Sequence, residues 1–155
     1  MKISDHISYR EAVKSVTAIR RDISNKPNQR QLENMRFVAD TVFEPLRKAL
    51  GNKPIGIASF YRSPLLNRII GGSPDSQHTK GEAMDIDADI LENGVTNREI
   101  FEWIYNNANF DQLIWEFGNE HEPDWVHVSK TKHGNRGEAL VAYRDKQVKY
   151  RYYEP

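Results

Sequence analysis

The chain has 155 residues, a length that is typical of one domain and sufficient for a hydrophobic core without disulfides. It contains no cysteine, which excludes a disulfide scaffold, a thiolate nucleophile and cysteine-based zinc or iron–sulfur sites. No apolar run approaches the ~18 residues of a membrane span, and the N-terminus lacks the apolar stretch of a signal peptide. We therefore expect one domain over residues 1–155, made in the cytoplasm.

The net charge of zero hides an uneven distribution of charged residues. Residues 1–74 hold 13 Lys and Arg against 6 Asp and Glu, residues 75–124 hold 2 against 13, and residues 130–155 hold 7 against 3. Either the three stretches interleave in space, or the acidic middle stretch contains a cation site. The basic residues are scattered and form no base-reading motif, so we expect no nucleic-acid partner.

The N-terminal part of the chain is predicted to be helical. A capping box at Ser8–Glu11 precedes apolar residues that recur every three or four positions as far as Ile23, which predicts one amphipathic helix. After a breaker at Asn25–Asn28, a second apolar stripe predicts another helix, which Pro45 should kink or end near Phe43–Glu44.

The rest of the chain alternates short strands with short helices. The expected elements are, in chain order, a buried strand at 55–60, a helix from Ser63 to Gly71, a loop at 73–81, a strand at 83–88, a helix opened by Thr96, strands at 112–117 and 125–128, and a hairpin of 139–143 with 147–152. This order predicts an α+β fold, with N-terminal helices packed on a small, mainly antiparallel sheet.

The stretch from Ser76 to Asp85 is the richest in potential chemistry. His78 precedes Asp85 by seven residues, and a turn at Gly81 would bring the two side chains together as half of a tetrahedral zinc site. His127 lies between two valines in a strand-like run, so its side chain should point to the polar side. Spacing alone also allows a hydrogen-bonded loop histidine beside a solvated Asp85.

A site made of His121, His127 and His133 is a further alternative, because these histidines are six residues apart. One extended strand would spread them over roughly 40 Å, so the chain would have to fold back sharply at Pro123 and Gly134.

The pattern Ser76-x-His78-x-x-Gly81-x-Ala83-x-Asp85 resembles the first zinc motif of the zinc D-alanyl-D-alanine carboxypeptidase family. That family includes D,D-dipeptidases and phage L-alanyl-D-glutamate endolysins, and it is related in fold to hedgehog domains. Asp124-x-x-His127 matches its second motif, and Tyr61–Pro64 looks like its arginine-bearing strand end. The resemblance runs from about Ser8 to Ser129, and the helical N-terminal half is similar to the phage-type branch.

The resemblance implies one zinc ion per chain, held by His78, Asp85 and His127. It also implies that Asp124 is the general base and that Arg62 steadies the carbonyl of the scissile bond. Ser76 stands where the family has a hydroxyl that faces the substrate or supports a ligand.

The second motif departs from the pattern of many members, which have Glu at the base position and Trp directly before the ligand His. Here the base position holds Asp124, as in the phage endolysin branch, and Glu122 or Glu116 could compete for the role. Glu116 lies in an apolar, strand-like run, where a carboxylate needs a partner. We expect it in the cleft, holding a ligand histidine or contacting substrate rather than acting as base.

The function implied by the resemblance is that of a zinc peptidase that cleaves peptide bonds in the peptidoglycan stem, with an endolysin-like L,D-endopeptidase favoured. The alternatives are a D,D-carboxypeptidase or dipeptidase on the same site, and a zinc-bearing binding or structural module without catalysis. We expect a monomer whose partner is the stem peptide, and which reaches the cell wall after release or in a phage particle.

Overall fold

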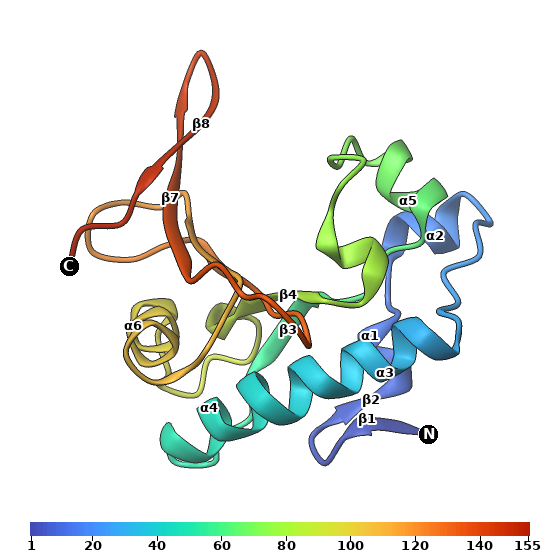
Figure 1. The fold of residues 1–155 in the computed structure, drawn as a ribbon, viewed down its shortest axis with the longest axis horizontal. Coiled ribbons are helices and arrows are strands. Elements are labelled where there is room, and N and C mark those ends of the chain that lie inside the picture. The colour runs from blue at the N-terminus through green and yellow to red at the C-terminus, as the bar shows by residue number, and fades with distance from the viewer.

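The computed structural model describes all 155 residues and has an α+β fold (Figure 1). The elements are, in chain order, β1 (Lys2–Ser4), β2 (Ile7–Ser8), α1 (Tyr9–Ala12), α2 (Val16–Arg20), α3 (Gln29–Val38), the π-helical turn η1 (Ala39–Phe43), α4 (Glu44–Ala49), β3 (Gly56–Ser59), α5 (Pro64–Ile69), the 3₁₀ turn η2 (Gln77–Lys80), β4 (Ala83–Asp87), the 3₁₀ turn η3 (Ala88–Ile90), α6 (Asn97–Asn107), β5 (Gln112–Glu116), β6 (Trp125–Ser129), β7 (Glu138–Asp145) and β8 (Gln147–Tyr152). None of the helices has the length and apolar character that a membrane span requires.

One six-stranded sheet organises the molecule, with the strand order β3-β4-β6-β5-β7-β8. All neighbouring strands are antiparallel except β5 and β7, which are parallel. The predicted fold class, an α+β fold with a mainly antiparallel sheet and N-terminal helices, is therefore confirmed. The hairpin of β7 and β8 extends away from the body of the molecule (Figure 1).

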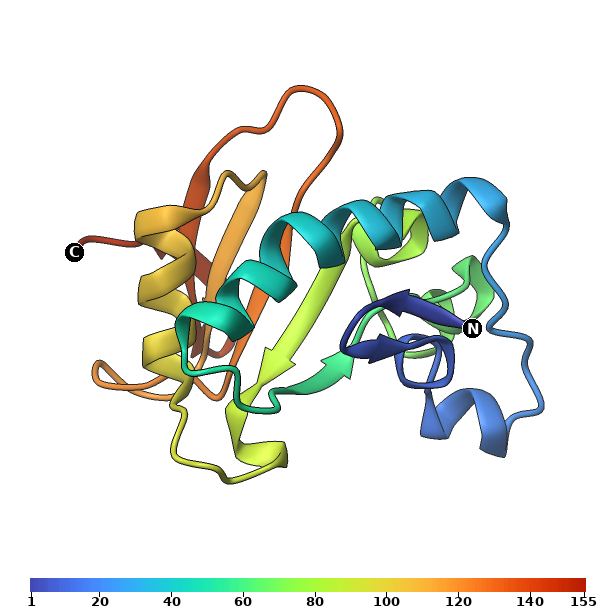
Figure 2. The same cartoon turned by 90° about the horizontal axis from the view of Figure 1, so that it is seen from below.

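Alternation along the central strands gives the sheet one apolar face and one polar face. The apolar side chains of β4, β5 and β6 belong to one buried cluster together with apolar residues of α3, α4 and α6. Figure 2 shows the long rod of α3 and α4 running across the sheet beside α6. Because helices occupy this face, the alternate residues of the same strands point to the other face, where Asp85 and His127 lie.

The expected single helix after Ser8 is wrong, because the chain forms two short helices there. Helix α1 ends at Ala12, and the Ser15 side chain begins α2 by accepting a hydrogen bond from the Ala18 amide at 3.1 Å. The apolar periodicity is also misleading, since Ile19 is 77% exposed. A second capping serine therefore overrides the periodic pattern.

The expectation that Pro45 kinks or ends the helix near Phe43–Glu44 is not met as an end, because the backbone stays helical from α3 through η1 into α4. The α-helical pattern of α3 widens into the π turn η1, and α4 begins at Glu44 with Pro45 in its first turn. The helical hydrogen-bond pattern is irregular at this point, since the Glu44 amide bonds to the Ala39 carbonyl five residues back, and Pro45 itself has no amide hydrogen to donate.

Candidate active site

The loop before β4 is shaped by hydrogen bonds within a few residues of the chain. The Ser76 hydroxyl accepts a hydrogen bond from the His78 amide at 3.3 Å, where η2 begins. Gly81 then ends η2 in the left-handed region, at a φ of 74°. A Cβ at this position would lie 2.5 Å from the Gln31 carbonyl oxygen, so only glycine fits the turn that leads into β4.

The ring of His78 is held in one orientation. Its side chain is 2% exposed, and Nδ1 lies 2.7 Å from the Phe60 carbonyl oxygen. Because a carbonyl only accepts hydrogen bonds, Nδ1 carries a proton. The other ring nitrogen, Nε2, faces Asp85, and a histidine that binds a metal through one nitrogen is commonly oriented through the other in this way.

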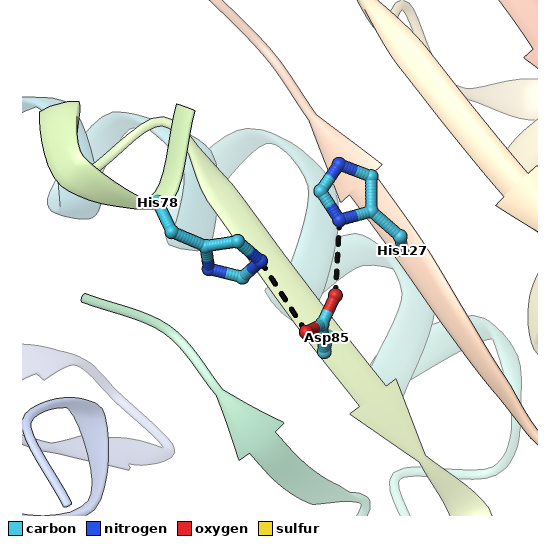
Figure 3. A group of neighbouring side chains, drawn as sticks. All are labelled: His78, Asp85 and His127. Atoms are coloured by element: carbon cyan, nitrogen blue, oxygen red, sulfur yellow. Dashed lines mark hydrogen bonds and ion pairs between the residues drawn. The ribbon is translucent and has the colours of Figure 1, made fainter. Parts of the chain in front are cut away.

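Asp85 lies between the two histidines (Figure 3). It is paired with His127 across β4 and β6, and the two carboxylate oxygens contact different rings. Asp85 Oδ2 is 3.3 Å from His78 Nε2, and Asp85 Oδ1 is 2.9 Å from His127 Nδ1. The ligand atoms of the three residues all lie within 4.8 Å of one another.

This donor set fits a zinc ion. Donor atoms bound to tetrahedral zinc at about 2.0–2.2 Å are separated from one another by roughly 3.3 Å. The two distances from Asp85 to the histidine nitrogens are close to that value, no two ligand atoms are more than 4.8 Å apart, and two imidazoles with one carboxylate are a common zinc ligand set. His78, Asp85 and His127 therefore form a candidate metal site, which leaves room for a fourth ligand.

The charges at the cluster favour an ionised Asp85. Burial alone would raise the pKa of this carboxyl, but the attraction of His78 and His127 and their hydrogen bonds outweigh it. The pKa of Asp85 is therefore held well below its usual range. The residue is an anion at any pH at which a metal would bind.

A cavity of about 660 Å³ opens over the cluster, and we call it the site pocket. Arg62 lines one side of it, and the Arg62 amide donates a hydrogen bond to the His78 carbonyl at 3.2 Å. The Nε atom of Arg62 is buried and has no hydrogen-bond partner. Burial lowers the pKa of Arg62, whereas the negative charge of Asp85 acts in the opposite direction. Since a buried, unpaired donor is costly, the guanidinium is poised for a group that a ligand supplies.

Glu116 also lines the site pocket. It pairs with Trp125 across β5 and β6, and Ile114, two residues before it, pairs with His127. Glu116 and His127 therefore share one face of the sheet as diagonal neighbours. The Glu116 residue is 9% exposed, and burial raises its pKa to about 7, with His127 opposing the rise and Asp85 adding to it.

The structure does not bring Asp124, the expected general base, into the site pocket. Asp124 precedes β6, whose pairing with β5 runs from Trp125 to Ser129, and its amide donates a hydrogen bond to the Glu116 carbonyl at 2.9 Å. Asp124 is not among the residues that line the site pocket. Asp124 is exposed and lines a neighbouring cavity together with Phe117 and Tyr143.

The other residues named from the sequence occupy separate positions. Glu122 accepts a hydrogen bond from the Asn97 amide at 2.9 Å and so stabilises the start of α6. His121 is on the surface beside Glu120, and neither it nor His133 belongs to the metal cluster. The three-histidine alternative is therefore not supported.

A comparison with protein families yields one match, in which the peptidase M15 model covers residues 5–129. The chain belongs to the peptidase M15 family. This confirms the resemblance to zinc D-alanyl-D-alanine carboxypeptidases and the hedgehog-related fold. A search of curated proteins found no match.

Membership of the M15 family together with the His78–Asp85–His127 cluster identifies the chain as a zinc metallopeptidase. The family consists of zinc-dependent hydrolases associated with peptidoglycan, and a peptidase acts on a peptide substrate. The matched segment includes the metal cluster, Arg62 and Glu116.

Part of the site pocket lies beyond the matched segment, and no sequence motif indicated these residues. Thr131, Gly134, Arg136 and Tyr150 all line the pocket and follow residue 129. They belong to no local motif. Thr131, Gly134 and Arg136 lie in the segment between β6 and β7, and only the return of the chain through β7 and β8 brings Tyr150 to the pocket.

Proposed function

We propose that this M15 peptidase cleaves a peptide bond within the peptidoglycan stem, as an L,D-endopeptidase. One observation supports this most strongly. The His78–Asp85–His127 cluster opens into a pocket in which the buried Nε of Arg62 still lacks a hydrogen-bond partner. A metal site beside an unpaired cationic donor is what hydrolysis of a peptide carbonyl requires.

His78, Asp85 and His127 would hold the zinc ion in this proposal. Zinc bound by three protein ligands keeps a fourth position open for water and lowers the pKa of that water to about 7. The chain itself must then supply a base for the water proton and a donor for the carbonyl oxygen.

Glu116 is the base in this proposal, in place of Asp124. It lines the same pocket as the cluster, whereas Asp124 lines a neighbouring cavity and not the site pocket. As the attacking water forms its bond to the carbonyl carbon, the Glu116 carboxylate accepts the water proton. It then passes that proton to the leaving amine, so one group serves as base and as acid.

Arg62 stabilises the negative charge that develops on the carbonyl oxygen. The guanidinium remains protonated in spite of burial, and its fork of donors suits an oxyanion. Ser76 acts through His78, because its hydroxyl fixes the turn from which the histidine projects.

Internal cleavage is favoured over carboxypeptidase action by the similarity of the helical N-terminal half to the phage-type branch. The pairing of Arg136 also withdraws one cation of the pocket, although Lys80, which lines the pocket too, forms no ion pair. A carboxypeptidase needs a cation for the terminal carboxylate of its substrate. Arg136 in the pocket already binds both carboxylate oxygens of Asp111, at 2.8 Å from Nη2 to Oδ2 and 3.1 Å from Nε to Oδ1.

The test is mass spectrometry of purified muropeptides after incubation with the enzyme, with and without a chelator. We expect chelator-sensitive products that arise from cleavage between L-alanine and D-glutamate. Loss of a terminal D-alanine instead would establish the carboxypeptidase alternative. Intact muropeptides in both samples, with zinc bound, would establish the non-catalytic alternative.

A further inference from the structure

The site pocket has two sides that come from distant parts of the chain. Arg62 and residues between Ser73 and Lys80 line one side, and Tyr150 of β8 contributes to the other. Figure 1 shows the segment around α5 and the β7–β8 hairpin rising on either side of the sheet. The first side belongs to the family-matched segment, whereas the hairpin lies wholly outside it.

The strand register places Tyr150 in line with Glu116. Glu116 pairs with Ala142 across β5 and β7, and Ala142 pairs with Tyr150 across β7 and β8. All three side chains therefore point to the same face of the sheet. Trp125 extends the same row on the other side of Glu116.

The small side chain of Ala142 leaves space between Glu116 and Tyr150. Two strand spacings separate their backbones by about 10 Å, and a residue with one methyl group lies between them. Tyr150 is half-exposed, forms no hydrogen bond through its phenol, and lines the pocket. Its hydroxyl is therefore available to a ligand that lies across Glu116.

The environment of Tyr150 keeps its hydroxyl protonated. Burial raises the pKa of the phenol, and the negative charge of Glu116 raises it further. The phenol is therefore a hydrogen-bond donor at neutral pH, and its ring offers an apolar surface beside a polar tip.

We propose that Tyr150 is a substrate-binding residue, and that the β7–β8 hairpin forms the side of the site pocket opposite Arg62. The ligand is an extended peptide, whose backbone packs on the Tyr150 ring and one of whose carbonyl oxygens accepts a hydrogen bond from the phenol. The inference rests on the proposed peptidase function and assigns a determinant of substrate affinity to a hairpin outside the family match.

Tyr152 provides a matched control. It lies two residues further along β8, on the same face of the same strand, and is 70% exposed. It does not line the site pocket. Removal of either ring should disturb the hairpin to a similar extent, but only removal of the Tyr150 ring should raise the KM for the substrate.

The experiment measures kcat and KM for a stem peptide with wild type, Tyr150→Phe, Tyr150→Ala and Tyr152→Ala, each with its zinc content. Loss of one hydrogen bond should raise KM about 2- to 10-fold in Tyr150→Phe. Tyr150→Ala should raise it further, with kcat within about 2-fold, because the contact is made equally in the ground and transition states. Tyr152→Ala should match wild type.

An unchanged KM in Tyr150→Ala, or an equal rise in Tyr152→Ala, would overturn the inference while leaving the proposed function in place. A wild-type enzyme that binds zinc and cleaves no stem peptide would overturn the proposed function, and this inference with it.

Discussion

Residues 76–85 and residues 116–127 both bring polar groups to the metal cluster, but they hold them by different means. In the first segment, the contacts are local: Ser76 caps η2, Gly81 makes the turn, and a short strand then presents Asp85. In the second segment, Glu116 and His127 lie on neighbouring strands and meet only through sheet pairing. The first arrangement depends on a few adjacent residues, whereas the second depends on the register of the whole sheet.

The largest effect is expected from removal of a ligand in the second segment. His127→Ala should lower zinc affinity by more than the ~100-fold that loss of a supporting hydrogen bond costs, and should abolish hydrolysis. The measurement is zinc content after dialysis. His121→Ala is the control, since that side chain is on the surface and outside the cluster. Stoichiometric zinc in His127→Ala would show that the sheet does not supply a ligand.

In the proposed mechanism, the side chain of Arg62, which lines the site pocket, contacts the substrate carbonyl. Arg62→Ala should retain zinc but reduce kcat by roughly 10²–10³-fold, because one oxyanion donor is lost. Arg62→Lys should restore little of this, since a single ammonium does not reproduce the fork of donors. Steady-state kinetics with matched zinc content measures both variants. If Arg62→Lys equals wild type, Arg62 is a structural cation only.

The turn at Gly81 tests how strongly the first segment depends on local geometry. Gly81→Ala should destabilise the protein by about 2–3 kcal/mol, because it combines a strained left-handed residue with a clash against Gln31. Gly71→Ala is the control for strain alone, since Gly71 has a φ of 79° and no atom within 4 Å of the added Cβ. That variant should lose only about 1 kcal/mol. If denaturant unfolding shows that Gly81→Ala and Gly71→Ala lose the same free energy of unfolding, the clash with Gln31 makes no contribution.

The smallest effect is expected at the Asp111–Arg136 pair, which joins the start of β5 to the segment before β7. Hydrogen bonds from Arg136 hold the pKa of Asp111 below its usual value, although partial burial opposes them. The pair therefore stabilises the fold at a pH above the pKa that Asp111 has in the unfolded chain. This stabilisation is lost as the pH falls through the lower pKa that Asp111 has in the folded protein. Arg136→Ala should cost about 1 kcal/mol at pH 7 and less near pH 3. A cost that does not change with pH would contradict the ionic origin.

The first segment could be predicted from the sequence because its causes are local. A capping serine, a glycine turn and an alternating strand can each be recognised within ten residues, and together they place His78 beside Asp85. The six strands of the main sheet and α6 could be predicted for the same reason, whereas the two-stranded sheet of β1 and β2 was not expected. The helix after Ser8 could not, because the capping effect of Ser15 outweighs the apolar periodicity.

The position of Asp124 shows what sequence spacing leaves open. A separation of three residues from His127 suggests proximity along the chain, but Asp124 lies just before β6 and lines a neighbouring cavity rather than the site pocket. Glu116 is eleven residues from His127 and reaches the same face through strand pairing. Tyr150 is further still, and only the register of three strands brings it into line with Glu116.

The central claim is that Glu116, and not Asp124, serves as the base, and the most direct test compares Glu116→Gln with Asp124→Asn. Both substitutions remove one charge and keep the shape of the side chain. The measurement is kcat/KM on a stem peptide at pH 7, with zinc content and thermal stability matched to wild type. We predict a loss of roughly 10²–10⁴-fold in Glu116→Gln and less than about 3-fold in Asp124→Asn. An inactive, zinc-loaded Asp124→Asn beside an active Glu116→Gln would contradict the account.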